Sequence, residues 1–72
     1  MTKIETYWCE DRPTLEDIKQ AFDIVKNNGV VVSIRWYIRY NGEHERIITK
    51  EDITTYSIED YFERAIPRTY GV

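Results

Sequence analysis

The strongest constraint on the fold is an alternating segment that ends in a turn signal. Apolar residues occupy every second position from Val30 to Ile38, with polar or aromatic residues between most of them. This period of two is typical of a β-strand with one buried face. Asn41-Gly42 follows soon after, and this dipeptide is the strongest short-range signal of a β-hairpin. We therefore expect a strand over 30–40, a two-residue turn and a returning strand over 43–49.

Two further segments have a helical pattern. Thr14 with Asp17, and Ser57 with Asp60, each place a capping residue three positions before an acid, ahead of apolar residues at helical spacing. Asn28-Gly29 supplies a left-handed end to the first helix, and Pro67 disfavours a helical residue before it. The patterns predict helices over 14–28 and 58–66.

These elements, with a first strand over residues 3–9 and a polar connection over 51–57, give the order β-α-β-β-α. The simplest arrangement is an α+β fold with a three-stranded, mainly antiparallel sheet and two helices packed on one face. A chain of 72 residues has room for a single small domain, residues 1–72. Residues 67–72 form either a flexible tail or an extended strand that adds to a partner. The aromatic residues expected in the core are Phe22, Trp36, Tyr61 and Phe62.

Composition excludes several classes of protein. The longest apolar run has three residues, far below the roughly 20 needed to span a membrane. One Cys cannot form an intramolecular disulfide, and one His without a suitably spaced partner predicts no metal site. The residues contain no nucleophile–base pair and no phosphate-binding glycine loop, so we expect no enzyme and no cofactor. The first residues lack the apolar stretch of a signal peptide, and we expect a cytoplasmic protein.

Charge is divided unevenly along the chain. The formal net charge is −3, but residues 33–50 carry four bases and two acids, whereas residues 51–63 carry five acids and no base. With a two-residue turn at Asn41-Gly42, Arg35 lies opposite Ile48 and Tyr37 lies opposite Arg46. This pairing gathers a basic, aromatic group on the strand face away from the core. The candidate binding residues are Arg35, Tyr37, Arg39, His44 and Arg46.

The same pairing directs Glu45 toward the core, so a bulge or a longer loop is the open alternative. A shift of one residue would regroup all these side chains.

Three functions remain open. The abundance of Tyr and Trp and the absence of catalytic motifs favour a non-enzymatic protein-binding module, such as a small inhibitor or adaptor. A short chain rich in aromatic and acidic residues is also typical of phage or mobile-element inhibitors. The alternative is a nucleic-acid-binding module in which Tyr37 stacks on bases while Arg35, Arg39, Arg46 and Lys50 contact phosphates. The third is a homodimer that extends the sheet through an open edge.

Overall fold

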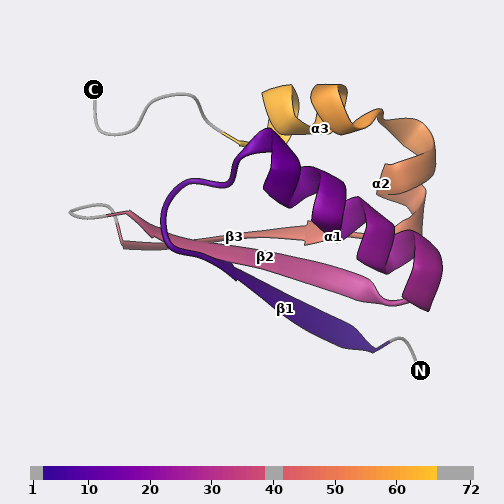
Figure 1. The fold of residues 1–72 in the computed structure, drawn as a ribbon, viewed down its shortest axis with the longest axis horizontal. Helices are drawn as coiled ribbons and strands as arrows, with labels where there is room; N and C mark the ends of the chain where they lie inside the picture. Colours follow the sequence, from indigo (N-terminus) through magenta and orange to yellow (C-terminus); the bar gives the residue numbers. More distant parts are fainter. Residues whose placement is uncertain (1–2, 39–41, 67–72) are drawn as a thin grey trace.

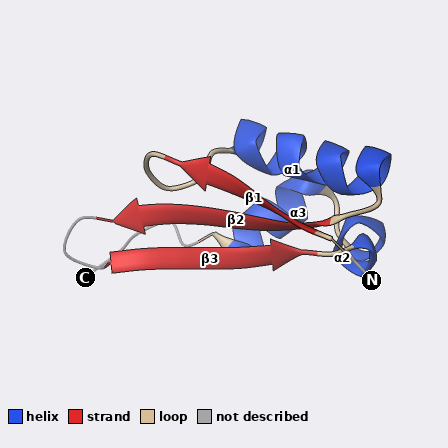
Figure 2. Cartoon of the chain, turned by 90° about the horizontal axis from the view of Figure 1, so that it is seen from below, coloured by secondary structure: helices blue, strands red, loops and turns tan. Residues whose placement is uncertain are grey.

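The computed structural model describes residues 3–38 and 42–66 and contains three strands and three helices in these ranges (Figure 1). The order is β1 (Ile4–Cys9), α1 (Leu15–Asn28), β2 (Val31–Ile38), β3 (Gly42–Ile48), α2 (Lys50–Thr55) and α3 (Ile58–Ala65). All three helices lie on one side of the sheet, and the other side is left open (Figures 1 and 2).

The sheet is mixed, with the strand order β1-β2-β3. β1 pairs with β2 in parallel, and β2 pairs with β3 antiparallel, so the prediction of a mainly antiparallel sheet is wrong. The reason lies in the connection between the first two strands. α1 carries the chain back along the sheet, so β2 starts at the same end as β1 and runs in the same direction.

Local capping chemistry sets the helix ends. Thr14 forms a capping box with Asp17 at the start of α1, and Gly29 ends the helix with a positive φ of 65°. The predicted first helix is therefore confirmed. α3 begins after Ser57, whose side chain accepts a hydrogen bond from the Asp60 N–H, and it ends one residue before the predicted limit.

α2 lies where a polar connection was predicted. Thr49 and Asp52 form the same reciprocal capping box as at the start of α1. The spacing of a Thr and an acid three residues later was therefore visible in the sequence. With only six residues, this helix has no apolar stripe long enough to reveal a helical period.

The core fills the space between the sheet and the helix layer. Trp36, Phe22 and Tyr61 are buried as predicted, and Phe62 is half-buried and packs against them. Phe22 and Tyr61 meet edge to face, with ring centroids 5.5 Å apart. Within the described ranges, no helix has the length and apolar character that a membrane crossing requires.

The pairing of β2 with β3 differs from the predicted one. Ile38 lies opposite Gly42, Tyr37 opposite Glu43 and Arg35 opposite Glu45. The partner of each β2 residue is shifted by three positions along β3 from the predicted one. Because side chains alternate between the two faces of a strand, a shift by an odd number of residues exchanges the two faces of β3. Three residues, 39–41, lie between the paired Ile38 and Gly42, so the connection is longer than the predicted two-residue turn. Asn41 lies outside the described residues, whereas Gly42, the other residue of the predicted turn, begins β3.

The physical reason for this pairing is the placement of one acid and one isoleucine. The predicted pairing would turn Glu45 toward the core, where an unpaired carboxylate is costly. The observed pairing turns Glu45 outward and buries Ile48 completely.

Candidate functional site: the open sheet face

The candidate site is the face of the sheet that no helix covers. We call it the outer sheet face. Its members are Ile4, Thr6 and Trp8 from β1, Val31, Ser33, Arg35 and Tyr37 from β2, and Glu43, Glu45 and Ile47 from β3.

Large apolar side chains on this face are unusually exposed. Five large hydrophobic side chains in the described ranges are exposed, and four of them belong to the outer sheet face. Their exposed fractions are 62% for Ile4, 60% for Trp8, 60% for Tyr37 and 42% for Ile47. A group of exposed aromatic and aliphatic residues on one surface is typical of an interaction site.

Arg35 stands at the centre of the outer sheet face. Its Nε lies 3.1 Å from Glu45 Oε2, and its Nη1 lies 3.3 Å from Glu43 Oε1. The guanidinium carbon is also 5.8 Å from the centroid of the Trp8 ring, within the range of a cation–π contact. Contacts with two acids and one aromatic ring hold the guanidinium group in place.

Glu45 accepts a second hydrogen bond besides the one from Arg35. The Ser33 hydroxyl donates a hydrogen bond of 2.6 Å to Glu45 Oε2. This bond and the hydrogen bond from Arg35 hold the pKa of the Glu45 carboxyl below its ordinary value. The side chain is therefore ionised at neutral pH, and the outer sheet face carries one positive and two negative charges among the described residues.

The structure brings together only part of the predicted site. Arg35 and Tyr37 lie on the outer sheet face, and Arg39 lies outside the described residues. His44 and Arg46 point to the helix side, so the predicted grouping is wrong for these two. The odd shift in pairing that exchanges the faces of β3 is the cause.

His44 and Arg46 have structural contacts on the helix side. The His44 ring stacks on Trp36 with centroids 5.5 Å apart and an interplanar angle of 17°. Arg46 Nε donates a hydrogen bond of 2.9 Å to the carbonyl of Ala65, the last residue of α3. A cation bonded to the last carbonyls of a helix stabilises its C-terminus.

Sequence reasoning missed Ile4, Trp8 and Ile47. The signal for the first two was present, because Ile4 and Trp8 fall on one face of β1 at period two. What the sequence did not reveal is that this face is the open one, since large apolar residues usually point to the core.

The lone thiol lies on the helix-facing side of β1. Burial, together with the charge of Asp17 and a hydrogen bond with it, raises the pKa of Cys9 to about 11. The thiol is therefore protonated at neutral pH, whereas a nucleophilic cysteine needs a lowered pKa. Across residues 3–38 and 42–66, no three His, Cys, Asp or Glu side chains form a group that could hold a metal ion.

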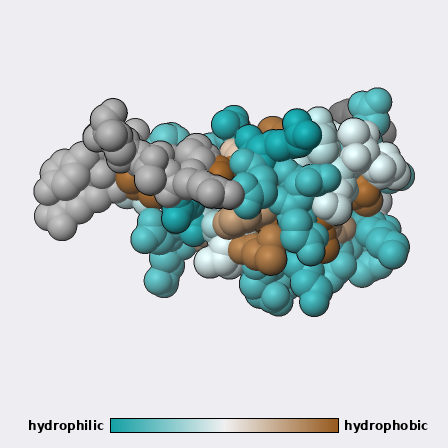
Figure 3. Space-filling model, turned by 90° about the horizontal axis from the view of Figure 1, so that it is seen from above, coloured by the Kyte–Doolittle hydropathy of each residue, from teal (hydrophilic) through white to brown (hydrophobic). Residues whose placement is uncertain are grey.

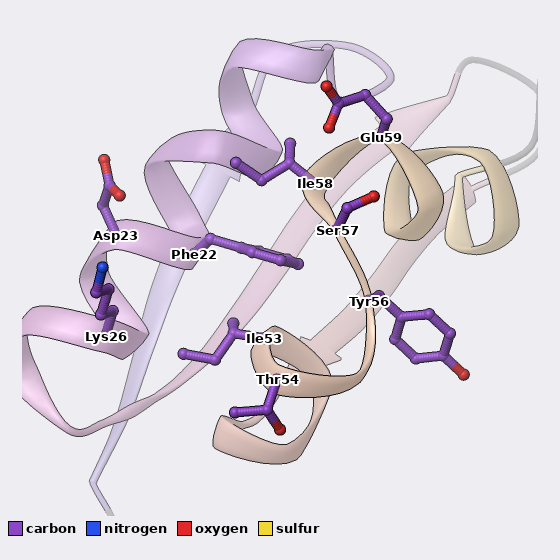
Figure 4. A pocket seen from close by; sticks show the side chains of 9 residues that line it. All are labelled: Phe22, Asp23, Lys26, Ile53, Thr54, Tyr56, Ser57, Ile58 and Glu59. Carbon is purple, nitrogen blue, oxygen red and sulfur yellow. The ribbon is translucent and has the colours of Figure 1, made fainter.

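A second surface feature is a groove of about 590 Å³ in the helix layer. Phe22, Ile53 and Ile58 come from three different helices and project into it, while Asp23 and Glu59 stand at its rim (Figure 4). Seen from the helix side, apolar surface lies in the middle of the layer with hydrophilic side chains around it (Figure 3). We call this feature the helix groove; its lining is completed by Lys26, Thr54, Tyr56 and Ser57.

No protein-family model matches the chain, and searches of curated proteins and of solved structures gave no match.

Proposed function

We propose that this chain is a non-enzymatic protein-binding module, such as a small inhibitor or adaptor, and that the outer sheet face is its contact surface. The observation that carries the proposal is the exposure of Trp8 and Tyr37 beside a fixed Arg35 on a face that no helix covers. Trp, Tyr and Arg are the residue types that dominate the energy of protein–protein contacts. Because these side chains extend from paired strands, little backbone conformational freedom is lost when a partner packs on them.

Charge favours a protein over a nucleic acid at this face. Arg35 already contacts two carboxylates, which add negative charge beside it. A phosphate backbone approaching here would meet a net negative surface among the described residues, and nucleic-acid affinity depends on unneutralised cations. His44 and Arg46 are turned away from this face and do not change that balance.

A comparative capture experiment tests the proposal. The chain is immobilised and exposed to a lysate of its source organism, and the recovered proteins are quantified for the wild type and for Trp8→Ser with Tyr37→Ser. We expect one stoichiometric partner whose affinity for the double variant is about 30-fold lower, as for the loss of a hot spot of about 2 kcal/mol, so that its recovery falls.

Leu15→Ser is the matched control, since Leu15 is an exposed large hydrophobic residue on α1 rather than on the sheet. It should retain the partner. Equal loss in the control, or recovery of nucleic acid alone, would contradict the proposal; circular dichroism checks that each variant is folded.

The nucleic-acid alternative has a direct test of its own. We expect no more than weak binding of single-stranded oligonucleotides, with little change after Arg35→Glu with Arg39→Glu. Tight binding that falls steeply with salt and is lost in this double variant would favour the alternative over a protein partner.

A further inference from the structure

We infer that the helix groove is a second binding site, which accepts the apolar face of a cationic amphipathic helix. It lies on the opposite side of the molecule from the outer sheet face, and the inference does not depend on the function proposed for that face.

The floor of the groove is apolar and well supported. Phe22 packs edge to face against Tyr61, and Ile53 and Ile58 are half-buried against the core. A volume of about 590 Å³ is large enough for more than one apolar side chain. In helix-in-groove recognition, residues one turn apart on an amphipathic helix fill a cleft of this kind.

The walls of the groove favour a helix over an extended strand. They are formed by α1, α2 and the start of α3, whose backbone groups are largely used within the helices. The groove therefore offers no strand edge for an added strand to pair with. An occupant that satisfies its own backbone hydrogen bonds fits this environment, because unpaired backbone groups are costly to bury.

The charged residues around the helix groove favour a positively charged occupant. Among the lining residues Asp23 and Glu59 are acidic and Lys26 is basic, and the guanidinium carbon of Arg64 lies 5.8 Å from the centroid of the Tyr56 ring. The segment 51–63, which forms one side of the groove, carries five acids and no base. Of these five acids, Glu59 lines the groove and Asp52 is engaged in the Thr49 capping box. The excess of acids gives this side of the molecule a negative field. This field favours Lys or Arg beside the apolar side chains of the occupant and repels nucleic acid and anionic membranes. A second copy is also disfavoured, since its α2–α3 segment has the same charge.

The probe is a synthetic amphipathic peptide of about 14 residues built from Leu and Lys, with Leu at positions i, i+3, i+4 and i+7. Two comparison peptides are used: one with the same residues in an order that breaks the apolar face, and one with Glu in place of Lys. Binding is followed by two-dimensional ¹⁵N NMR of the labelled protein. We expect only the first peptide to shift the amide signals of Phe22, Ile53 and Ile58.

Charge variants test the rim. Asp23→Lys with Glu59→Lys should weaken the Leu/Lys peptide about tenfold and allow the Leu/Glu peptide to bind. Glu10→Lys with Asp11→Lys changes the total charge equally in the exposed loop before α1 and should alter affinity far less. If the reversed rim fails to fold, Asp23→Asn with Glu59→Gln replaces it, with a smaller expected loss in the same direction.

Three results would each overturn the inference. These are equal weakening by the rim and loop variants, equal binding of the peptide without an apolar face, or signal shifts confined to the sheet residues.

Discussion

At the scale of single residues, Asp17 joins β1 to α1. Its carboxylate accepts hydrogen bonds from the Thr14 N–H at 2.8 Å and from the Tyr7 hydroxyl at 3.0 Å. Burial alone would raise the pKa of this carboxyl, but the hydrogen bonds from Thr14, Tyr7 and Cys9 outweigh it and lower the pKa. The Thr14–Asp17 pair was predictable, because capping depends on neighbours in the chain. The Tyr7 bond was not, because it spans ten residues and depends on how α1 lies against the strand.

Asp17→Asn should lower the free energy of unfolding by about 1 kcal/mol at pH 7, through loss of a charged acceptor. A carboxyl whose pKa is lowered in the folded state stabilises the fold fully above its unfolded pKa of about 4. That contribution is lost as the pH falls through the lower, folded value. Urea denaturation at pH 7 and near pH 2 should therefore show a difference between wild type and variant that shrinks in acid.

Asp23→Asn serves as the control for this measurement, because Asp23 is an exposed carboxylate beyond the first turn of the same helix. It should change stability by less than about 0.5 kcal/mol. If the difference in the free energy of unfolding between the wild type and Asp17→Asn stays constant with pH, the charge of Asp17 does not have this role.

At the scale of elements, the starts of α1 and α3 were predicted, whereas the start of α2 and the pairing of β3 were not. Thr14 and Ser57 act on amides three residues away, so the sequence alone contains the whole interaction. The pairing of β2 with β3 depends instead on which register leaves Glu45 paired and Ile48 buried, a comparison between segments. The turn dipeptide indicated a hairpin but did not fix the number of residues between the strands.

Arg46 tests the corrected pairing. Arg46→Gln removes the charged donor to the Ala65 carbonyl and should cost about 1 kcal/mol of stability. The Ile66 amide, which bonds to the Phe62 carbonyl at the end of α3, should exchange its hydrogen faster. Arg46→Lys keeps the charge but not the fixed geometry of the guanidinium group and should have a smaller effect. A variant with unchanged stability and exchange but lost partner binding would return Arg46 to the binding surface.

At the scale of the whole molecule, the sequence did not show which face of each strand the helices cover. In the strand order β1-β2-β3, the two edge strands are β1 and β3, and they differ in charge. β3 presents four consecutive charged or titratable residues, from Glu43 to Arg46, which protect an edge against further pairing. β1 carries Glu5 as its one charged side chain, and its outward residues Ile4 and Trp8 are both exposed.

This contrast makes β1 the edge through which we expect a homodimer to form. In an antiparallel pair of β1 strands centred on Thr6, Ile4 of one copy lies opposite Trp8 of the other on the outer sheet face, and no like charges meet. The Val31 N–H donates a hydrogen bond to the Lys3 carbonyl, so the backbone groups of the odd-numbered residues of β1 point toward β2. The backbone N–H and carbonyl of Thr6 therefore point toward the free edge of the sheet. Thr6→Pro therefore removes an outward donor and leaves the β1–β2 hydrogen bonds in place.

Sedimentation equilibrium over a range of concentrations measures this self-association. We expect the average mass of the wild type to rise with concentration and Thr6→Pro to keep the mass of one chain. Ile47→Pro, which places the same residue at the β3 edge, should associate like the wild type. A constant mass of one chain for the wild type, or equal loss of association in both variants, would show that β1 is not the contact.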